Sequence, residues 1–305
     1  MGGILSTMVS VIVFAFGLAV GSFLNAVIYR LAVHQGLYPN SYDRRNRGIN
    51  PFQGRSFCPS CGHQLAWYDL VPLVSYLLLR GRCRYCGQRI SLQYPFVELA
   101  TGLLFVLIFA KLGLAVENLA GLSFPQAISL FRLIYLWAIA GLLVAIFVYD
   151  LKHFIIPDRF VYPAIAIAAA FRVFEALDQT TWEVVAQFWF LAIRAPTHLI
   201  GALAAAFLAF GFFFALHTLS RGKWMGFGDV KLALFMGLFL GFPNILVALA
   251  CAFVLGALVG IVLILAKKKT MRSQVPFGPF LVLGTFVALF WGGALVDFYL
   301  SLLLV

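Results

Sequence analysis

Long apolar segments constrain the fold of this chain more than any other feature of its sequence. A helix needs about 20 apolar residues to cross roughly 30 Å of hydrocarbon. Of the 305 residues, 63% are apolar and 11% are charged, far from the composition of a soluble domain. We therefore predict an all-α polytopic membrane protein, embedded in a lipid bilayer, with about eight transmembrane helices. The predicted helices span residues 4–28, 96–115, 129–149, 159–175, 195–217, 229–242, 244–266 and 278–304.

Basic residues fall on alternate connections between these helices. Most of the 22 Lys and Arg residues lie at residues 30–89, 152–159, 221–231 and 267–272, whereas acidic residues such as Glu183 lie on the other connections. The positive-inside rule then predicts that both termini face the outside and that the long loop after the first helix faces the cytoplasm. Because topology accounts for the net charge of +11, we expect no nucleic-acid partner.

The chain is predicted to have three parts. Residues 1–29 form transmembrane helix one, residues 30–95 form a small cytoplasmic cysteine domain, and residues 96–305 form a transmembrane domain. The first segment has no charged n-region and is longer than the usual apolar core of a signal peptide, so we expect it to remain as a helix. A domain of about 65 residues buries little core, which makes a metal or disulfide staple important.

Four cysteines supply candidates for that staple. Cys58 and Cys61 belong to one CxxCG motif, and Cys83 and Cys86 belong to a second one 21 residues later. This spacing is typical of a structural zinc site with four thiolate ligands. Disulfides and a redox CxxC role are alternatives, but the predicted cytoplasmic location disfavours disulfides, and two matched motifs fit a metal better. We predict a zinc-ribbon-like domain.

Two aspartates lie at the predicted cytoplasmic ends of helices. Asp150 closes the third predicted helix, and Asp229 opens the sixth directly after Gly226, Phe227 and Gly228. Acidic residues in membrane segments are costly and are often functional. The predicted topology places both carboxyl groups at one depth on one side, as an aspartyl dyad requires. The glycines on either side of Phe227 would let a backbone come close to Asp229.

Each aspartate also has an interpretation without chemistry. Asp229 could be a helix N-cap, and Asp150 could pair with Lys152 or Arg159 at the interface. Asp158, which follows Pro157, is expected to be a turn or cap residue with a supporting role in the site.

Several further motifs complete a pattern along nearly the whole chain. They are Gly21-Ser22-Phe23-Leu24-Asn25, Asp69-Leu70-Val71-Pro72-Leu73, Tyr94-Pro95 with Glu98, Ile156-Pro157-Asp158, Gly226-Phe227-Gly228-Asp229-Val230-Lys231 and Pro276-Phe277-Gly278-Pro279-Phe280. Together with the cysteine motifs, this ordered set resembles the bacterial type IV prepilin peptidases, the leader peptidases and N-methyltransferases of the GxGD aspartyl protease class.

The resemblance implies more than the composition does. It implies an aspartic endopeptidase of the bacterial inner membrane that removes basic leader peptides from type IV prepilins and pseudopilins and then methylates the new N-terminus with S-adenosylmethionine. It assigns catalysis to Asp150 and Asp229, with Gly226, Gly228, Lys231, Pro157, Asp158 and Gly278 supporting the site. The small residues Gly226, Gly228 and Gly278 would leave room for an unwound substrate backbone. Relatives that lack the cysteine domain are peptidases only, so its presence favours the bifunctional type.

Some questions stay open at this stage. No GxGxxG nucleotide-binding motif occurs in the chain, so the methyl-donor site is not assigned. Glu98 or Asp69 is a candidate to receive the basic leader. The alternatives are a proton- or ion-coupled transporter that uses the same aspartates, and an assembly factor that binds pilins without cutting them. Transporters usually place their acids near the midplane and often show inverted repeats, which this chain lacks.

Overall fold

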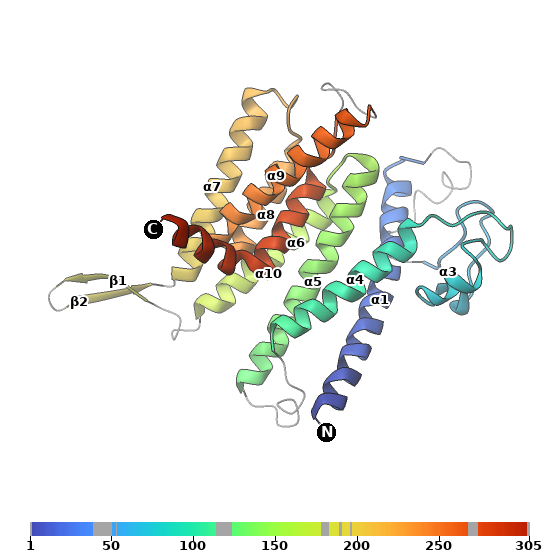
Figure 1. Cartoon of the computed structure of the whole chain (residues 1–305), viewed down its shortest axis with the longest axis horizontal. Coiled ribbons are helices and arrows are strands. Elements are labelled where there is room, and N and C mark those ends of the chain that lie inside the picture. The colour runs from blue at the N-terminus through green and yellow to red at the C-terminus, as the bar shows by residue number, and fades with distance from the viewer. Residues whose placement is uncertain are drawn as a thin grey trace. The chain divides into compact units, whose positions relative to one another are not determined.

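The structure is a computed structural model that describes most of the chain. The described residues are 2–38, 51–52, 54–113, 124–177, 183–188, 191–195, 197–267 and 274–303. Six basic residues of the topology prediction lie outside them: Arg44, Arg45, Arg47, Lys268, Lys269 and Arg272. The chain forms two compact units, residues 1–145 and residues 146–305, and the boundary falls within α5 (Phe124–His153), which Figure 1 draws in green. These units group the chain by packing, whereas the predicted division into 1–29, 30–95 and 96–305 groups it by environment.

Two crossing helices form the framework of the first unit. Helix α1 (Gly2–His34) packs along α4 (Gln93–Lys111), as Figure 1 shows. A Cβ atom added to Gly17 would lie 2.8 Å from the Cα of Gly102, and one added to Gly21 would lie 2.7 Å from the Cα of Glu98. The backbones therefore approach too closely for a side chain at these positions, as in small-residue packing between membrane helices.

The cysteine domain lies between these two helices in the sequence. Its described regular structure is limited to a 3-10 helix, η1 (Trp67–Leu70), and one short α-helix, α3 (Val74–Leu78). Two isolated antiparallel bridges, Phe57 with Gln64 and Arg82 with Arg89, close one loop around each cysteine pair. So little regular structure fits a domain whose stability depends on a staple.

A short buried helix organises the second unit. Helix α8 (Phe227–Leu240) packs against all four other long helices of this unit that follow α5. These are α6 (Asp158–Leu177), α7 (Thr197–Leu219), α9 (Asn244–Leu265) and α10 (Gly278–Leu303), which Figure 1 draws in yellow to red. Nearly every residue of α8 from Asp229 onward is buried. Its neighbours come close: a Cβ added to Gly237 would overlap the backbone of Ala206 on α7.

The all-α membrane class is confirmed, with one refinement of the helix count. Seven described helices are long and apolar enough to cross a membrane. The eighth predicted segment, 229–242, is α8, whose 14 residues rise only about 21 Å. Because other helices surround α8, its backbone ends need not reach the lipid boundary.

A β-hairpin between α6 and α7 was not predicted. Strands β1 (Glu183–Phe188) and β2 (Leu191–Ala195) pair antiparallel, with Glu183 opposite Ala195. Most of this stretch was predicted to be a connection and the next helix to begin at residue 195, whereas α7 begins at Thr197. Strand propensity is strongly dependent on context, and segments this short carry little periodic signal.

Candidate active site and candidate metal centre

Asp150 and Asp229 come together inside the second unit. Asp150 lies in the last turn of α5 and is 4% exposed, and Asp229 lies in the first turn of α8 and is 9% exposed. The two carboxyl groups are near enough for a negative charge on Asp150 to act on Asp229. Residues 79 positions apart in the sequence thus form one buried pair.

Asp229 is not the N-cap of its helix, so that interpretation is wrong. Helix α8 begins at Phe227, its N-cap is Gly226, and Asp229 is its third residue. The carboxylate of Asp229 accepts a hydrogen bond from the backbone N–H of Gly226. An acid in the first turn also lies near the positive end of the helix dipole, which favours its ionised form.

Gly278 contacts Asp150 directly. The backbone N–H of Gly278, at the start of α10, donates to the carboxylate of Asp150. A Cβ at position 278 would lie 2.5 Å from Oδ2 of Asp150 and 3.1 Å from Cδ1 of Ile156. A backbone donor, rather than Lys152 or Arg159, is therefore the hydrogen-bond partner that the structure gives Asp150.

The glycines of the site make room for the chain's own residues. A Cβ at Gly228 would lie 2.9 Å from Cβ of Ile156, and the side chains of Asp150 and Ile156 fill the space that a Cβ at Gly278 would need. The expectation that Gly228 and Gly278 leave room for substrate is therefore wrong at these two positions. At Gly226 a Cβ would meet only ordinary contacts, the nearest being 3.7 Å away at Oδ2 of Asp229.

An ion pair joins the two helices that begin beside the aspartates. Lys231 on α8 donates to the carboxylate of Asp158, the first residue of α6. The ammonium of Lys231 also lies 5.2 Å from the ring centroid of Tyr162 and 5.4 Å from that of Phe227. Pro157 is buried just before α6. Its carbonyl accepts hydrogen bonds from the backbone N–H groups of Phe160 and Val161 in the first turn of the helix. These contacts hold the first turns of α6 and α8 together.

Arg172, which was not among the predicted site residues, binds the opposite end of α8. From α6, its Nε donates to the carbonyl of Leu238 at 2.9 Å and its Nη2 donates to that of Phe239 at 2.6 Å. Its Nη1 pairs with Glu175 at 2.8 Å. The last carbonyls of a helix have no partners within the helix, so the guanidinium satisfies them and complements the helix dipole. A lone basic residue inside an apolar segment was the available signal.

The arrangement of the aspartates suits acid–base chemistry. Two adjacent carboxyl groups in a buried site cannot both ionise at low cost, so one retains a proton while the other is charged. Such a pair can donate a proton at one oxygen and accept one at another.

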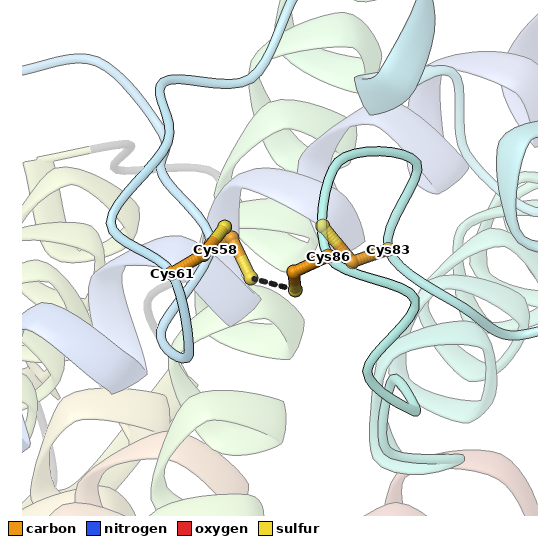
Figure 2. Close-up of side chains that lie close together, drawn as sticks. All are labelled: Cys58, Cys61, Cys83 and Cys86. Carbon is orange, nitrogen blue, oxygen red and sulfur yellow. Dashed lines mark hydrogen bonds between the residues drawn. The ribbon is translucent and has the colours of Figure 1, made fainter.

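The four cysteines form a second cluster, in the first unit. Their sulfur atoms all lie within 4.8 Å of one another, and those of Cys58 and Cys86 are 3.9 Å apart. Figure 2 shows the two cysteine loops facing each other across this gap. All four are free thiols. In a tetrahedral site with metal–sulfur distances of about 2.3 Å, the sulfurs lie about 3.8 Å apart, so this cluster can hold a metal ion.

The backbone around the cysteines repeats in the two motifs. The N–H of Cys58 donates to the carbonyl of His63 and that of Cys83 donates to Gln88, at 2.9 and 2.8 Å. The turns require positive φ at the glycine after each second cysteine, 72° at Gly62 and 68° at Gly87. Each motif is thus a preformed knuckle with its sulfurs aimed at one point.

The knuckle backbone also tunes the thiols. Burial raises the pKa of Cys58 to about 12. Burial alone would raise the pKa of Cys83 as well, but the backbone N–H groups of Tyr85 and Cys86 point at its sulfur and lower the pKa to about 7. Because a metal binds thiolates, ligation by this cluster must release protons.

Asp69 is occupied within the cysteine domain. Its carboxylate accepts from Arg84 at 2.8 Å, from the hydroxyl of Tyr85 at 3.0 Å and from the N–H of Ala66 at 3.3 Å. Burial alone would raise the pKa of Asp69, but these donors outweigh it and lower the pKa. With a side chain that is only 3% exposed, Asp69 is a structural link rather than a receiver for a leader peptide.

Comparisons with known proteins address the whole chain. Residues 15–112 match the bacterial peptidase A24 N-terminal domain, and residues 137–261 match the type IV leader peptidase family. A prepilin leader peptidase/N-methyltransferase from Aeromonas hydrophila is 31% identical over 300 residues, which cover 95% of this chain and 93% of the relative. The chain belongs to the type IV leader peptidase family. Relatives of the same name from Legionella pneumophila and Pseudomonas aeruginosa are each 30% identical and cover 94% and 93% of this chain, and 92% and 91% of their own lengths.

Membership of the leader peptidase family confirms the resemblance seen in the sequence. The two matched domains separate the cysteine-containing part from the part that carries Asp150 and Asp229. The transporter alternative finds no support among these relatives. No solved structure matches the chain.

Proposed function

We propose that this chain is a prepilin leader peptidase that cleaves with Asp150 and Asp229. The observation that carries the proposal is the buried carboxyl pair, which two glycine N–H groups hold in place inside the family's peptidase domain. The relatives are named as peptidases of prepilin leaders, and they match this chain over nearly its full length.

The pair performs peptide hydrolysis as follows. The ionised carboxylate takes a proton from a water molecule, whose oxygen attacks the carbonyl carbon of the scissile bond, while the protonated carboxyl hydrogen-bonds the carbonyl oxygen. When the tetrahedral intermediate collapses, the C–N bond breaks and a proton passes to the leaving nitrogen. The products are a leader with a new carboxylate and a shortened chain with a free N-terminal amine. The N–H groups of Gly226 and Gly278 keep both carboxyls oriented.

The proposed substrate class comes from the relatives, which are named prepilin leader peptidases, and it fits a chain with several membrane-length helices. Type IV prepilins and pseudopilins, with a basic leader before an apolar helix, present a scissile bond at the membrane interface. We place the aspartates and the cysteine domain on the cytoplasmic side, with both termini outside, because the basic connections favour that orientation. Asp158 and Lys231 would support the site by fixing the first turns of α6 and α8.

The second proposed activity is methylation of the new N-terminus, with S-adenosylmethionine as co-substrate. Its support is the name of the relatives and the cysteine domain. We assign zinc to the four thiolates as a structural ion, since a closed set of four sulfurs leaves no open position for catalysis. Bound there, zinc would join the two knuckles and so stabilise the fold of the domain.

The test is to mix the purified protein in detergent with a full-length prepilin and follow the substrate by mass spectrometry. We expect the substrate to lose the mass of its leader and, with S-adenosylmethionine present, to gain one methyl group. A folded protein that leaves the prepilin intact would sink the proposal. An intact prepilin that nevertheless binds the protein would instead indicate a purely structural assembly factor.

A further inference from the structure

A buried amide on α1 has an acceptor atom that no described residue of the unit uses. Asn25 is 2% exposed, and its Nδ2 donates to the backbone carbonyl of Tyr94 on α4 at 3.1 Å. That carbonyl can only accept, so the orientation of the amide is fixed. The other atom, Oδ1, is buried and has no hydrogen-bond partner among the described residues. A buried acceptor without a donor is costly and calls for an explanation.

A buried carboxylate lies one turn further along the same helix pair. Glu98 is 7% exposed, and it accepts from the backbone N–H of Leu73 at 2.9 Å and from the hydroxyl of Ser22. None of the ion pairs in the described parts of the chain includes Glu98. A carboxylate has about four acceptor positions, so capacity remains for further donors.

The two groups share one helix interface. Tyr94 precedes Glu98 by four residues on α4, and Gly21 precedes Asn25 by four residues on α1. Tyr94 contacts Asn25, while Gly21 packs so tightly on Glu98 that an added Cβ would lie 2.7 Å from its Cα. Residues four apart on a helix lie on one face, so Asn25 and Glu98 occupy adjacent turns of this seam.

We propose that Asn25 and Glu98 form a binding site for a primary ammonium group, an inference that rests on the proposed methyltransferase function. Among the described residues, the amide oxygen of Asn25 has no donor and the carboxylate of Glu98 has no cation. An ammonium group supplies both N–H donors and positive charge. The proposed methylation brings two such groups: the new N-terminal amine of the shortened substrate and the α-amino group of S-adenosylmethionine. The chemistry at Asn25 and Glu98 is the same for either source.

The contact with Leu73 offers a route into this site. Leu73 joins the cysteine domain to Glu98, and its φ of 58° and ψ of −48° are strained for a residue with a side chain. An arriving ammonium can replace the N–H of Leu73 on the carboxylate, and release of Leu73 removes the strain.

The test measures binding rather than turnover and uses the full-length protein in detergent. The first probe is a peptide with the mature N-terminal sequence of a prepilin, prepared with a free amine and with an acetylated N-terminus. The second probe is S-adenosylmethionine, compared with its analogue that lacks the α-amino group. We expect wild-type protein to prefer the amine form of at least one probe by about tenfold to a hundredfold.

Two variants and one matched control decide the outcome. Asn25→Leu and Glu98→Gln should each remove most of that preference, whereas general damage to the fold would weaken both forms of a probe equally. Thr101→Val is the control, because Thr101 is buried on the same face of α4 and its hydroxyl donates within the helix, to the carbonyl of Val97. Glu98→Gln keeps the shape of the site and an acceptor for Leu73 should Asn25→Leu fail to fold.

The two arms identify the source of the ammonium. Loss of preference only for the peptide assigns the site to the methyl acceptor, loss only for S-adenosylmethionine assigns it to the donor, and loss for both shows that it takes either. If neither variant changes either preference, or wild type shows none, the site does not exist. Leader cleavage is not needed for any of these measurements, so this failure is distinct from failure of the prepilin mass assay.

Discussion

Gly278 donates its backbone N–H to the carboxylate of Asp150 and leaves no space between the two residues for a side chain. A Cβ at position 278 would lie 2.5 Å from Oδ2 of Asp150. The first residue of α10 therefore sets the position of a carboxyl group on α5, and a rigid backbone donor orients it. Orientation of this kind is worth more to catalysis than to binding, since small misplacements of a reacting group cost rate.

Substitution of Gly278 by alanine should consequently impair cleavage more than folding. The methyl group must push Asp150 or α10 away, at a cost of about 1–3 kcal/mol for overpacking, and we expect the rate to fall about 100-fold, the cost of a misplacement near 1 Å. Gly293→Ala is the matched control on the same helix, because nothing lies within 4 Å of a Cβ there. Cleavage rates and thermal unfolding midpoints in detergent check this prediction. Equal rates for the two variants would show that the contact has no catalytic consequence.

Loss of Arg172 should destabilise the second unit. Arg172→Leu removes the guanidinium that donates to the carbonyls of Leu238 and Phe239 and pairs with Glu175, which should lower the free energy of unfolding by about 3 kcal/mol. Arg172→Lys keeps the charge but cannot reproduce the forked contact, so an intermediate effect is expected. Thermal unfolding midpoints rank the three proteins, and a midpoint for Arg172→Leu equal to that of wild type would contradict the capping role.

Metal analysis should find one zinc ion for each chain. Cys58→Ser and Cys86→Ser should each lose most of it, because a serine hydroxyl is a poor replacement for a thiolate ligand. Cys251→Ser should keep it, since Cys251 lies on α9, outside the cluster. Zinc at full occupancy in Cys58→Ser would rule out the four-thiolate site.

The cysteine domain should become less stable at acidic pH because its fold uses the ionised form of Asp69. Its pKa is lower in the folded chain than the ordinary value, so the ionised carboxylate stabilises the fold above the unfolded pKa of about 3.9, and this contribution disappears as the pH falls through the folded pKa. Asp69→Asn should cost about 1–2 kcal/mol near neutral pH, and its difference from wild type should shrink below about pH 4. Unfolding midpoints of both proteins at each pH give this difference. A gap that stays constant down to the lowest pH would exclude the ionised form as its cause.

Much of this architecture was predictable because lipid imposes simple rules. The apolar segments predicted the long helices to within a few residues at most ends, and the CxxCG spacing predicted that Cys58, Cys61, Cys83 and Cys86 would meet. The predicted topology placed Asp150 and Asp229 at one depth in the membrane, which was enough to predict that they form a pair.

What escaped prediction depends on packing between distant segments. The sequence around Asp229 suits an N-cap, but tertiary contacts let α8 begin two residues earlier, at Phe227. The need for glycine at position 278 is explained by Asp150 and Ile156, which lie 128 and 122 residues before it. Likewise, Arg172 and Asn25 look like isolated polar residues until the helices that carry their partners are packed beside them.

The central claim is that Asp150 and Asp229 together cut the leader, and the product mass from single-residue variants tests it most directly. Asp150→Asn and Asp229→Asn preserve shape and remove the acid, so each should lower the rate of prepilin shortening by about 10²–10⁴-fold or more. Asp297→Asn, at an exposed position on α10, is the matched control and should cut like wild type. If either aspartate variant shortens the prepilin at the wild-type rate, the two residues are not a catalytic pair.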